Sequence, residues 1–349
     1  MTRIAIDVFG GDYAPSATIE GSVQALKSFA DIELLLFGDE EKIQFELKKY
    51  PEADRNRILI LHAPEVISLE ESPTAAIRSK KDSSMVRGLA AVKAGEAACL
   101  VSAGSTGALL AGATLIMRRI PGVKRPALGM AIPNKTGGFT LLMDCGANTD
   151  SKPSYLLQFA VMASAYLEGV MGVKEPRIGL LNNGAEAEKG NALTKAAYPL
   201  LASAPIRFAG NCEAREILSG DFDAVICDGF DGNIVLKYTE GLADALMSML
   251  KTELLADKRS KLGAALSKPA FRRFKKTMDY TEYGGAPLLG VDGGVIKAHG
   301  SSNAKAFCRG GYTRYHRRRH GRPARDRGLT SGPYHAKLSL VIPSNHTFY

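Results

Sequence analysis

The sequence predicts an α/β protein, built as a three-layer α/β/α sandwich around a largely parallel sheet. Segments of strand length alternate with longer amphipathic segments of helix length along most of the chain. The strand-length segments are apolar throughout and carry almost no alternating polar face, which is typical of strands covered by helices on both sides. A chain of 349 residues is long for one core, but α/β proteins often exceed the usual domain size, so we expect one large α/β unit.

The expected strands follow one another at regular intervals, separated by helical segments. Two helix starts are visible in the sequence: Ser72 precedes Pro73, and Asp39 precedes an acidic first turn. A capping side chain or a proline in the first turn favours a helix start. We find no internal repeat. The strands are expected at residues 4–8, 32–37, 58–61, 97–102, 127–132, 140–143, 177–181 and 224–227, with a further apolar strand from Val295.

The net charge of +9 is concentrated at one end of the chain. Residues 308–349 hold nine lysines and arginines against Asp326 alone, which gives +8 and leaves +1 for residues 1–307. Affinity for nucleic acid would therefore belong to the tail, and no nucleic-acid partner is expected for the fold. We divide the chain into an α/β domain, 1–307, and an atypical Arg-rich tail, 308–349. The tail is expected to be disordered or the product of a shifted reading frame.

Cysteine usage and hydropathy indicate a cytoplasmic protein. The five cysteines are an odd number and show no metal-ligand or redox spacing, so neither a disulfide framework nor a metal is expected. The N-terminus lacks a signal-type apolar run, and the purest apolar run, 107–117, is too short to span a bilayer. We expect a chain that neither leaves the cell nor crosses a membrane.

The loops that follow the expected strands are rich in glycine, carboxylate, amide and hydroxyl groups, and ligands of such sheets bind at the carboxyl ends of strands. The stretch Val101-Ser-Ala-Gly-Ser-Thr-Gly joins a strand to a helix and offers backbone N–H groups to an anion, which suits phosphate. It lacks a Walker lysine and a dinucleotide fingerprint, so neither ATP nor NAD is indicated and no cofactor is expected. The alternative is an ordinary strand-to-helix turn with Ser105 as the N-cap.

The order and spacing of many such blocks over residues 1 to about 307 closely resemble the PlsX-type phosphate acyltransferases. The likeness stops after Phe307, where chains of that family normally continue with a long helix. The matching blocks are Ile4-Ala-Ile-Asp-Val-Phe-Gly-Gly-Asp, Lys81-Asp-Ser-Ser-Met, Val101-Ser-Ala-Gly-Ser-Thr-Gly-Ala-Leu, Asp144-Cys-Gly-Ala-Asn, Gly179-Leu-Leu-Asn-Asn-Gly, Lys189-Gly-Asn-Ala-Leu-Thr-Lys, Asp228-Gly-Phe-Asp-Gly-Asn, Tyr283-Gly-Gly-Ala-Pro-Leu-Leu-Gly and Val295-Ile-Lys-Ala-His-Gly-Ser-Ser.

The resemblance implies a fold like phosphotransacetylase and isopropylmalate dehydrogenase, with a protruding basic helical hairpin. It implies transfer of a long-chain acyl group from acyl carrier protein to inorganic phosphate, giving acyl phosphate for phospholipid (phosphatidic acid) synthesis. It further implies a homodimer that works beside a downstream membrane glycerol-3-phosphate acyltransferase. Three alternatives stay open: a short-chain phosphotransacetylase that uses coenzyme A, a non-catalytic membrane scaffold, and a nucleic-acid binder that acts through the Arg-rich tail.

The resemblance favours Lys189 and Asn233 as catalytic residues, and the position of His299 before Gly300-Ser301-Ser302 makes it a third candidate. Lys189 would neutralise phosphate or the oxyanion, Asn233 would hold the thioester carbonyl or phosphate, and His299 would give a proton to the leaving thiolate. The alternatives are a solvated lysine, a turn residue and a structural histidine. Phosphate attacks by itself, so Cys145 and Cys227 receive no role. The expected phosphate and substrate ligands are Asp7, Gly10, Gly11, Ser102, Gly104, Ser105, Thr106, Gly107, Asp144, Asn148 and Asn182.

A basic stretch, 258–276, carries eight lysines and arginines, no acid, and interleaved leucines and phenylalanines. It predicts two short helices joined near Pro269, within an amphipathic hairpin at about 250–279. Such a surface suits an anionic membrane, which places the protein at the inner face of the cell membrane. The alternative is a solvated face whose phenylalanines pack on the body or a partner subunit. The expected membrane-binding residues are Lys261, Leu262, Ala265, Leu266 and Lys268.

Overall fold

The computed structural model of the protein describes residues 1–278 and 285–308. The proposed tail therefore lies outside the described residues, except for its first residue. That residue, Cys308, is buried and packs in the same apolar cluster as Ile19 and Val23. The division of the chain after Phe307 stays a prediction.

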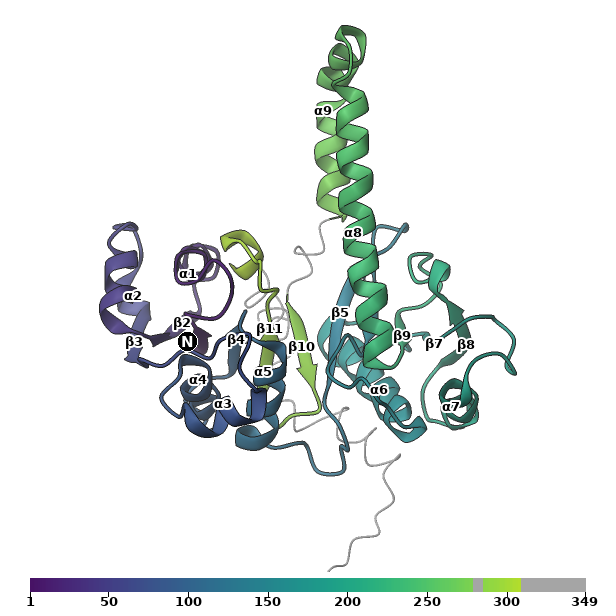
Figure 1. Ribbon diagram of the computed structural model, residues 1–349, viewed down its shortest axis with the longest axis horizontal. Helices are drawn as coiled ribbons and strands as arrows, with labels where there is room; N and C mark the ends of the chain where they lie inside the picture. The colour runs from purple at the N-terminus through teal and green to yellow at the C-terminus, as the bar shows by residue number, and fades with distance from the viewer. Residues whose placement is uncertain (279–284, 309–349) are drawn as a thin grey trace, which may run out of the picture.

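Within the described residues, one sheet of eleven strands runs through the molecule in the order β3-β2-β1-β4-β11-β10-β5-β6-β9-β7-β8 (Figure 1). In chain order the strands are β1 Thr2–Asp7, β2 Ile32–Gly38, β3 Ile58–His62, β4 Cys99–Ser102, β5 Ala127–Pro133, β6 Phe139–Met143, β7 Ile178–Asn182, β8 Phe208–Glu213, β9 Ala224–Ile226, β10 Ala286–Leu289 and β11 Gly294–Lys297. Each strand predicted from an apolar run is present within two residues of its expected start and end.

The sheet is largely parallel, as predicted, and consists of two parallel halves. β3, β2, β1, β4 and β11 form the first half, and β6, β9, β7 and β8 form the second. Between them, β10 is antiparallel to β11 and to β5, and β5 is antiparallel to β6. The apolar pattern did not predict β8 or β10. β8 contains Gly210 and Asn211 and lies at the edge of the sheet, while β10 is only four residues long.

Helices connect the strands and begin at recognisable capping signals. The Asp39 carboxylate accepts a hydrogen bond from the backbone N–H of Lys42, and Pro73 occupies the first turn after Ser72, which confirms both predicted starts. The helices are α1 Ser16–Ser28, α2 Glu40–Leu47, α3 Pro73–Ser79, α4 Ser84–Lys93, α5 Thr106–Gly112, α6 Pro153–Tyr166, α7 Ala192–Ala202, α8 Gly229–Leu254 and α9 Lys258–Met278.

Helices cover both faces of the sheet, which confirms the three-layer architecture (Figure 1). In β1, the buried side chains of Ile4 and Ile6 belong to one apolar cluster with residues of α1 and α2. Ala5 between them belongs to a second cluster with residues of α4 and α5. Alternate side chains of a strand point to opposite faces, so one strand contributes to two cores.

The hairpin formed by α8 and α9 projects from the body (Figure 1). The prediction of two short helices joined near Pro269 is wrong: α9 runs through Pro269, and the turn lies at residues 255–257. Asp257 explains the position of the turn, because its carboxylate accepts hydrogen bonds from the backbone N–H groups of Arg259 and Ser260. A proline inside an exposed helix removes one N–H bond, and water can solvate the carbonyl that is freed.

No helix in the described part of the chain is both long enough and apolar enough to cross a membrane.

Candidate active site

Three glycine-containing loops meet at the ends of neighbouring parallel strands β1, β4 and β11. A side chain at Gly10 would lie 2.7 Å from the backbone nitrogen of Gly104, and one at Gly11 would lie 3.0 Å from the carbonyl oxygen of Gly300. The backbone N–H of Asp12 donates to that same carbonyl at 2.9 Å. Glycine is required here because the backbones approach too closely for a Cβ atom. The predicted ligands Gly10, Gly11 and Gly104 thus share one surface.

A buried carboxylate supports these loops from below. The Asp7 carboxylate accepts hydrogen bonds from the hydroxyls of Ser84 at 2.5 Å and Ser102 at 2.6 Å. Burial raises the pKa of Asp7, while the two serines and the charge of Lys297 oppose that rise. Asp7 is 2% exposed and Ser102 is 0% exposed. Both side chains face the protein interior and support the loops, so a contact of either one with substrate stays a prediction.

Ser105 adopts the capping role that the sequence left open. Its hydroxyl oxygen accepts a hydrogen bond from the backbone N–H of Ala108 in the first turn of α5. Thr106 and Gly107 follow it and are partly buried. The loop before α5 is thus fixed in place by its own cap and by its contact with Gly10.

Lys297 is a site residue that sequence reasoning missed. Its ammonium is almost completely buried at the end of β11 and donates to the carbonyl oxygens of Ala103, at 3.3 Å, and Ala298. Burial lowers the pKa of Lys297 to about 8, and the carboxylates of Asp7 and Asp12 oppose that change. The sequence carried one signal for this role: Lys297 lies inside the apolar run 295–298. A lysine is rarely buried without partners, so its position there indicates a specific contact.

Lys237 and His299 connect the two halves of the sheet. The Lys237 ammonium, on α8, lies 3.1 Å from Nε2 of His299, in the loop after β11, and 3.2 Å from a carboxylate oxygen of Glu240. Burial and the charge of Lys237 lower the pKa of His299. A neutral imidazole is a poor proton donor, so this geometry does not favour the expected role of His299 as the acid for the thiolate. Lys237 was not singled out from the sequence.

The loop after β6 is built around a second buried carboxylate. Asp144 accepts hydrogen bonds from the backbone N–H groups of Leu128, Ala147 and Asn148 and from the Asn148 side-chain amide. Burial raises the pKa of Asp144 to about 6, against the effect of these donors. The Asn148 amide also donates to the carbonyl of Pro126. Asp144 is fully buried and shapes the loop together with the Asn148 amide, so a contact of either residue with substrate stays a prediction.

Replacing Asp144 with asparagine is expected to destabilise the protein. The new amide would point its N–H groups at backbone and side-chain donors that now bond to a carboxylate oxygen. Leaving these buried donors unpaired should lower the free energy of unfolding by about 3 kcal/mol in total. We expect thermal unfolding several degrees lower, measured by circular dichroism. Asp150→Asn is the matched control, because Asp150 is exposed in the same loop. Equal melting temperatures for the two variants would contradict this account.

Asn233 lies on the first turns of α8, directly against this loop. A Cβ atom at Gly146 would lie 3.5 Å from the Cβ of Asn233, and one at Gly232 would overlap the carbonyl oxygen of Asp144. Asn233 itself is exposed. Residues four apart share a helix face, so Asn233 and Lys237 lie on the same side of α8. This places a free amide one turn from the cation that contacts His299.

Lys189 and Asn182 lie on the loop that follows β7. The Asn182 amide donates to the backbone carbonyl of Lys189 at 3.1 Å, and Gly190 has a φ of +107° that favours glycine. The Lys189 side chain is exposed, and among the described residues its ammonium contacts neither Asn233 nor His299. β7 neighbours β9, so the loop lies at the strand end next to the start of α8.

Relatives of known name share most of this chain. A family model described as "Fatty acid synthesis protein" matches residues 2–316. A phosphate acyltransferase of Clostridium botulinum is 53% identical over 304 residues, which cover 87% of this chain and 90% of the relative. One from Clostridium perfringens is 52% identical over 306 residues, with coverage of 87% and 90%. The chain belongs to the PlsX-type phosphate acyltransferase family. Membership makes it an acyltransferase.

Solved structures share the fold of this family member. A phosphotransacetylase from Streptococcus pyogenes superimposes with a TM-score of 0.58 at 16% identity, covering 90% of this chain and 92% of the other. A branched-chain phosphotransacylase from Enterococcus faecalis gives 0.56 at 12% identity, covering 91% and 99%. The predicted likeness to phosphotransacetylase in fold is confirmed.

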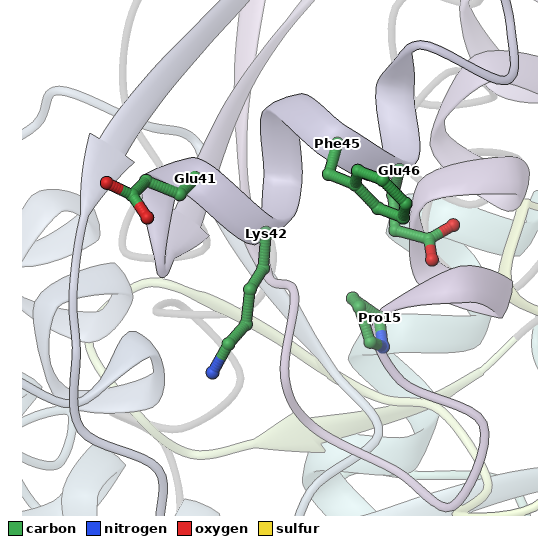
Figure 2. Close-up of a pocket in the computed structure, with 5 residues that line it drawn as sticks. All are labelled: Pro15, Glu41, Lys42, Phe45 and Glu46. Carbon is green, nitrogen blue, oxygen red and sulfur yellow. The ribbon is translucent and has the colours of Figure 1, made fainter.

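The buried cysteines and one surface hollow lie outside the candidate site. Burial raises the pKa of the Cys145 and Cys227 thiols well above the usual range, which keeps both protonated and unreactive. A hollow of about 470 Å³ lies between the start of α1 and one face of α2. Figure 2 shows the side chains that line it. None of the site residues lines it. It is lined by Pro15, Glu41, Lys42, Phe45 and Glu46.

Proposed function

We propose that this acyltransferase moves a long-chain fatty acyl group from acyl carrier protein to inorganic phosphate. A phosphate oxygen forms a bond to the thioester carbonyl carbon, the carbon–sulfur bond breaks, and the carrier-protein thiolate leaves with the electron pair. The acyl phosphate formed would supply phospholipid (phosphatidic acid) synthesis. One observation carries the proposal: in a member of the phosphate acyltransferase family, three glycine loops converge beside Lys237 and His299, with Asn233 one turn away.

Positioning and charge stabilisation are sufficient for this chemistry. Phosphate is partly a dianion at neutral pH and needs no protein nucleophile. The exposed amide of Asn233 can donate to the thioester oxygen as negative charge develops on it, and the ammonium groups of Lys189 and Lys237 can offset that charge. The role of Lys189 requires its exposed side chain to turn toward Asn233 when substrate binds.

We infer that the tip of the α8–α9 hairpin binds an anionic membrane at the inner face of the cytoplasmic membrane. Leu262 and Leu266 are 66% and 77% exposed, although both are large and apolar. Lys261, Ala265 and Lys268 are exposed around them. Exposed leucines beside lysines fit shallow insertion into a lipid surface. Acyl phosphate released there would be close to a membrane-bound glycerol-3-phosphate acyltransferase.

Changing Leu262 and Leu266 to aspartate is expected to weaken binding to vesicles of anionic phospholipid about tenfold or more, because two inserting groups are lost and two repelled charges are gained. Sedimentation with the vesicles measures the effect, and turnover on a soluble substrate should stay unchanged. Leu69→Asp provides a control, since Leu69 is exposed elsewhere on the surface. Equal loss in the control and the hairpin variant would argue against a membrane-binding tip.

The exposed apolar side chains along α8 support the proposal that two copies of this chain form a homodimer. Ile234, Tyr238, Leu242 and Leu246 are all exposed and recur every four residues, which places them along one face. A second copy of the chain would cover this face, and light scattering on the purified protein measures the mass directly.

The test of the proposed function is phosphate-dependent release of free thiol from palmitoyl acyl carrier protein. Acyl phosphate formation by the full chain would support the proposal. A preference for acetyl coenzyme A would favour the short-chain phosphotransacetylase. Vesicle binding by a folded protein without turnover would favour the scaffold.

A further inference from the structure

The contact between Lys237 and His299 joins parts of the protein that are far apart in sequence. Lys237 belongs to α8, which leaves the second half of the sheet after β9, and His299 follows β11 in the first half. Among residues 1–278 and 285–308, the Lys237 ammonium has two partners, the Glu240 carboxylate at 3.2 Å and Nε2 of His299 at 3.1 Å. A lysine ammonium has three N–H donors, so one donor remains for a further acceptor. The side chain is 55% exposed, so a ligand can reach it.

The direction of these hydrogen bonds follows from the charge of lysine. An ammonium donates and cannot accept, so Nε2 of His299 is the acceptor and the ring proton lies on Nδ1. Nδ1 faces two groups of Ser301: the backbone N–H, with its nitrogen at 3.2 Å, and the hydroxyl oxygen at 2.8 Å. The hydroxyl oxygen is the nearer of the two and is the acceptor for the Nδ1 proton. His299 is thus held between Ser301 and Lys237 as a neutral ring. The histidine orients the lysine and carries no charge of its own.

The charges around His299 fit this arrangement. Two cations, Lys237 on α8 and Lys297 at the end of β11, act on the ring together with two carboxylates, Asp12 from the loop after β1 and Glu240 on α8. Burial and the Lys237 charge lower the pKa of His299, while Glu240 and Asp12 oppose them. Because the His299 ring is uncharged, the cations of this group are Lys237 and Lys297. Lys297 is buried, whereas Lys237 is exposed and has an N–H donor for a ligand.

We propose that Lys237 binds the phosphate substrate through its free N–H donor, and that His299 is a positioning residue that holds the ammonium at the junction of the two halves. The proposal rests on the proposed acyl transfer to phosphate and assigns to Lys237 an anion-binding role that the sequence suggested for Lys189. Asn233, one turn earlier on the same face of α8, places an amide donor beside it. A phosphate bound there would lie beside the loop after β11, in which Gly300 contacts Gly11 and Asp12.

The first experiment measures steady-state kinetics of the full chain with varied phosphate and varied acyl carrier protein substrate. Lys237→Met should raise the KM for phosphate about 20-fold and leave the KM for the acyl substrate within about twofold, the size expected for one charge-assisted hydrogen bond. Lys237→Arg should restore most of the affinity, because arginine keeps the charge. An unchanged KM for phosphate, or equal rises in both constants, would overturn the proposal.

The second experiment tests His299 as a positioning residue. His299→Leu should raise the KM for phosphate about fivefold, and His299→Gln should restore it, because the glutamine oxygen can accept from Lys237. In the wild type, protonation of His299 at acid pH would remove that acceptor and raise the KM for phosphate. Protonation of phosphate itself raises the KM at acid pH in both proteins, so the ratio of the wild-type KM to the His299→Gln KM is compared across pH. The ratio should rise at acid pH, and a constant ratio would contradict the assignment.

Calorimetric titration with inorganic phosphate alone separates this proposal from the proposed function. If the wild type binds phosphate and Lys237→Met binds it at least about tenfold more weakly, the site stands even without turnover. If both bind equally, or if the wild type does not bind phosphate, the site is refuted. Thermal unfolding of each variant confirms that it is folded before either measurement.

Discussion

Asn233→Ala is expected to lower phosphate-dependent acyl transfer by about a hundredfold to a thousandfold, the loss measured when one donor to a developing oxyanion is removed. The side chain is exposed on the first turns of α8 and packs beside Gly146, so its removal leaves no cavity in the core. The loss should therefore appear in the rate and not in the melting temperature. Single-turnover formation of acyl phosphate measures it without interference from product release.

The matched control is Asn56→Ala, because Asn56 is also exposed and lies far along the chain from the site. Lys189→Ala belongs in the same series, and a loss of similar size is expected if its ammonium reaches the reacting atoms. A wild-type rate in Asn233→Ala would remove the amide from the mechanism. A wild-type rate in Lys189→Ala alone would leave Lys237 as the cation of the site.

Lys297→Met should also lower turnover by about a hundredfold, although Lys297 need not touch substrate. Its ammonium ties the carbonyl of Ala103 to the end of β11 and places a charge near Asp7. Methionine has a similar length and packs well, but it provides neither donor nor charge. The loop before α5 would lose a fixed position, and small displacements of binding groups are costly in catalysis.

The same variant changes how stability depends on pH. The pKa of Lys297 is about 8 in the folded chain and 10.5 when unperturbed. Between these values the unfolded chain binds more protons than the native chain, so the free energy of unfolding of the wild type rises with pH. The rise is about 3 kcal/mol over this window, and below pH 8 the full cost of burying the charge is present.

Lys297→Met lacks this group, so its free energy of unfolding does not show this rise. The difference in free energy of unfolding, variant minus wild type, should therefore fall by about 3 kcal/mol between pH 8 and pH 10.5. Urea unfolding of both proteins at several pH values gives the difference, and other titrating groups cancel in the comparison. Parallel curves would show that Lys297 is not a buried cation.

Nine of the eleven described strands and the starts of α2 and α3 were predictable because their causes are local. Apolar strands such as β1 must be buried on both faces, whichever helices cover them. Asp39 caps α2 through a bond to a residue three positions away, and Gly10 and Gly104 were recognisable as loop glycines next to strand ends. Membership in the family followed from the order of these blocks. The glycine-containing loops after β1 and β4 were thus predictable before their contacts were known.

The tertiary structure decided which polar side chains face substrate and which support the site. Asp7 and Asp144 look like ligands in the sequence, yet both are buried and paired with local and distant donors. Lys237 meets His299 across 62 positions, and Lys297 meets Ala103 across 194. Such contacts depend on β10 and β11 entering the middle of the sheet. Local periodicity does not encode this strand pairing, because the stabilising free energy comes from burial between segments that are distant in the chain.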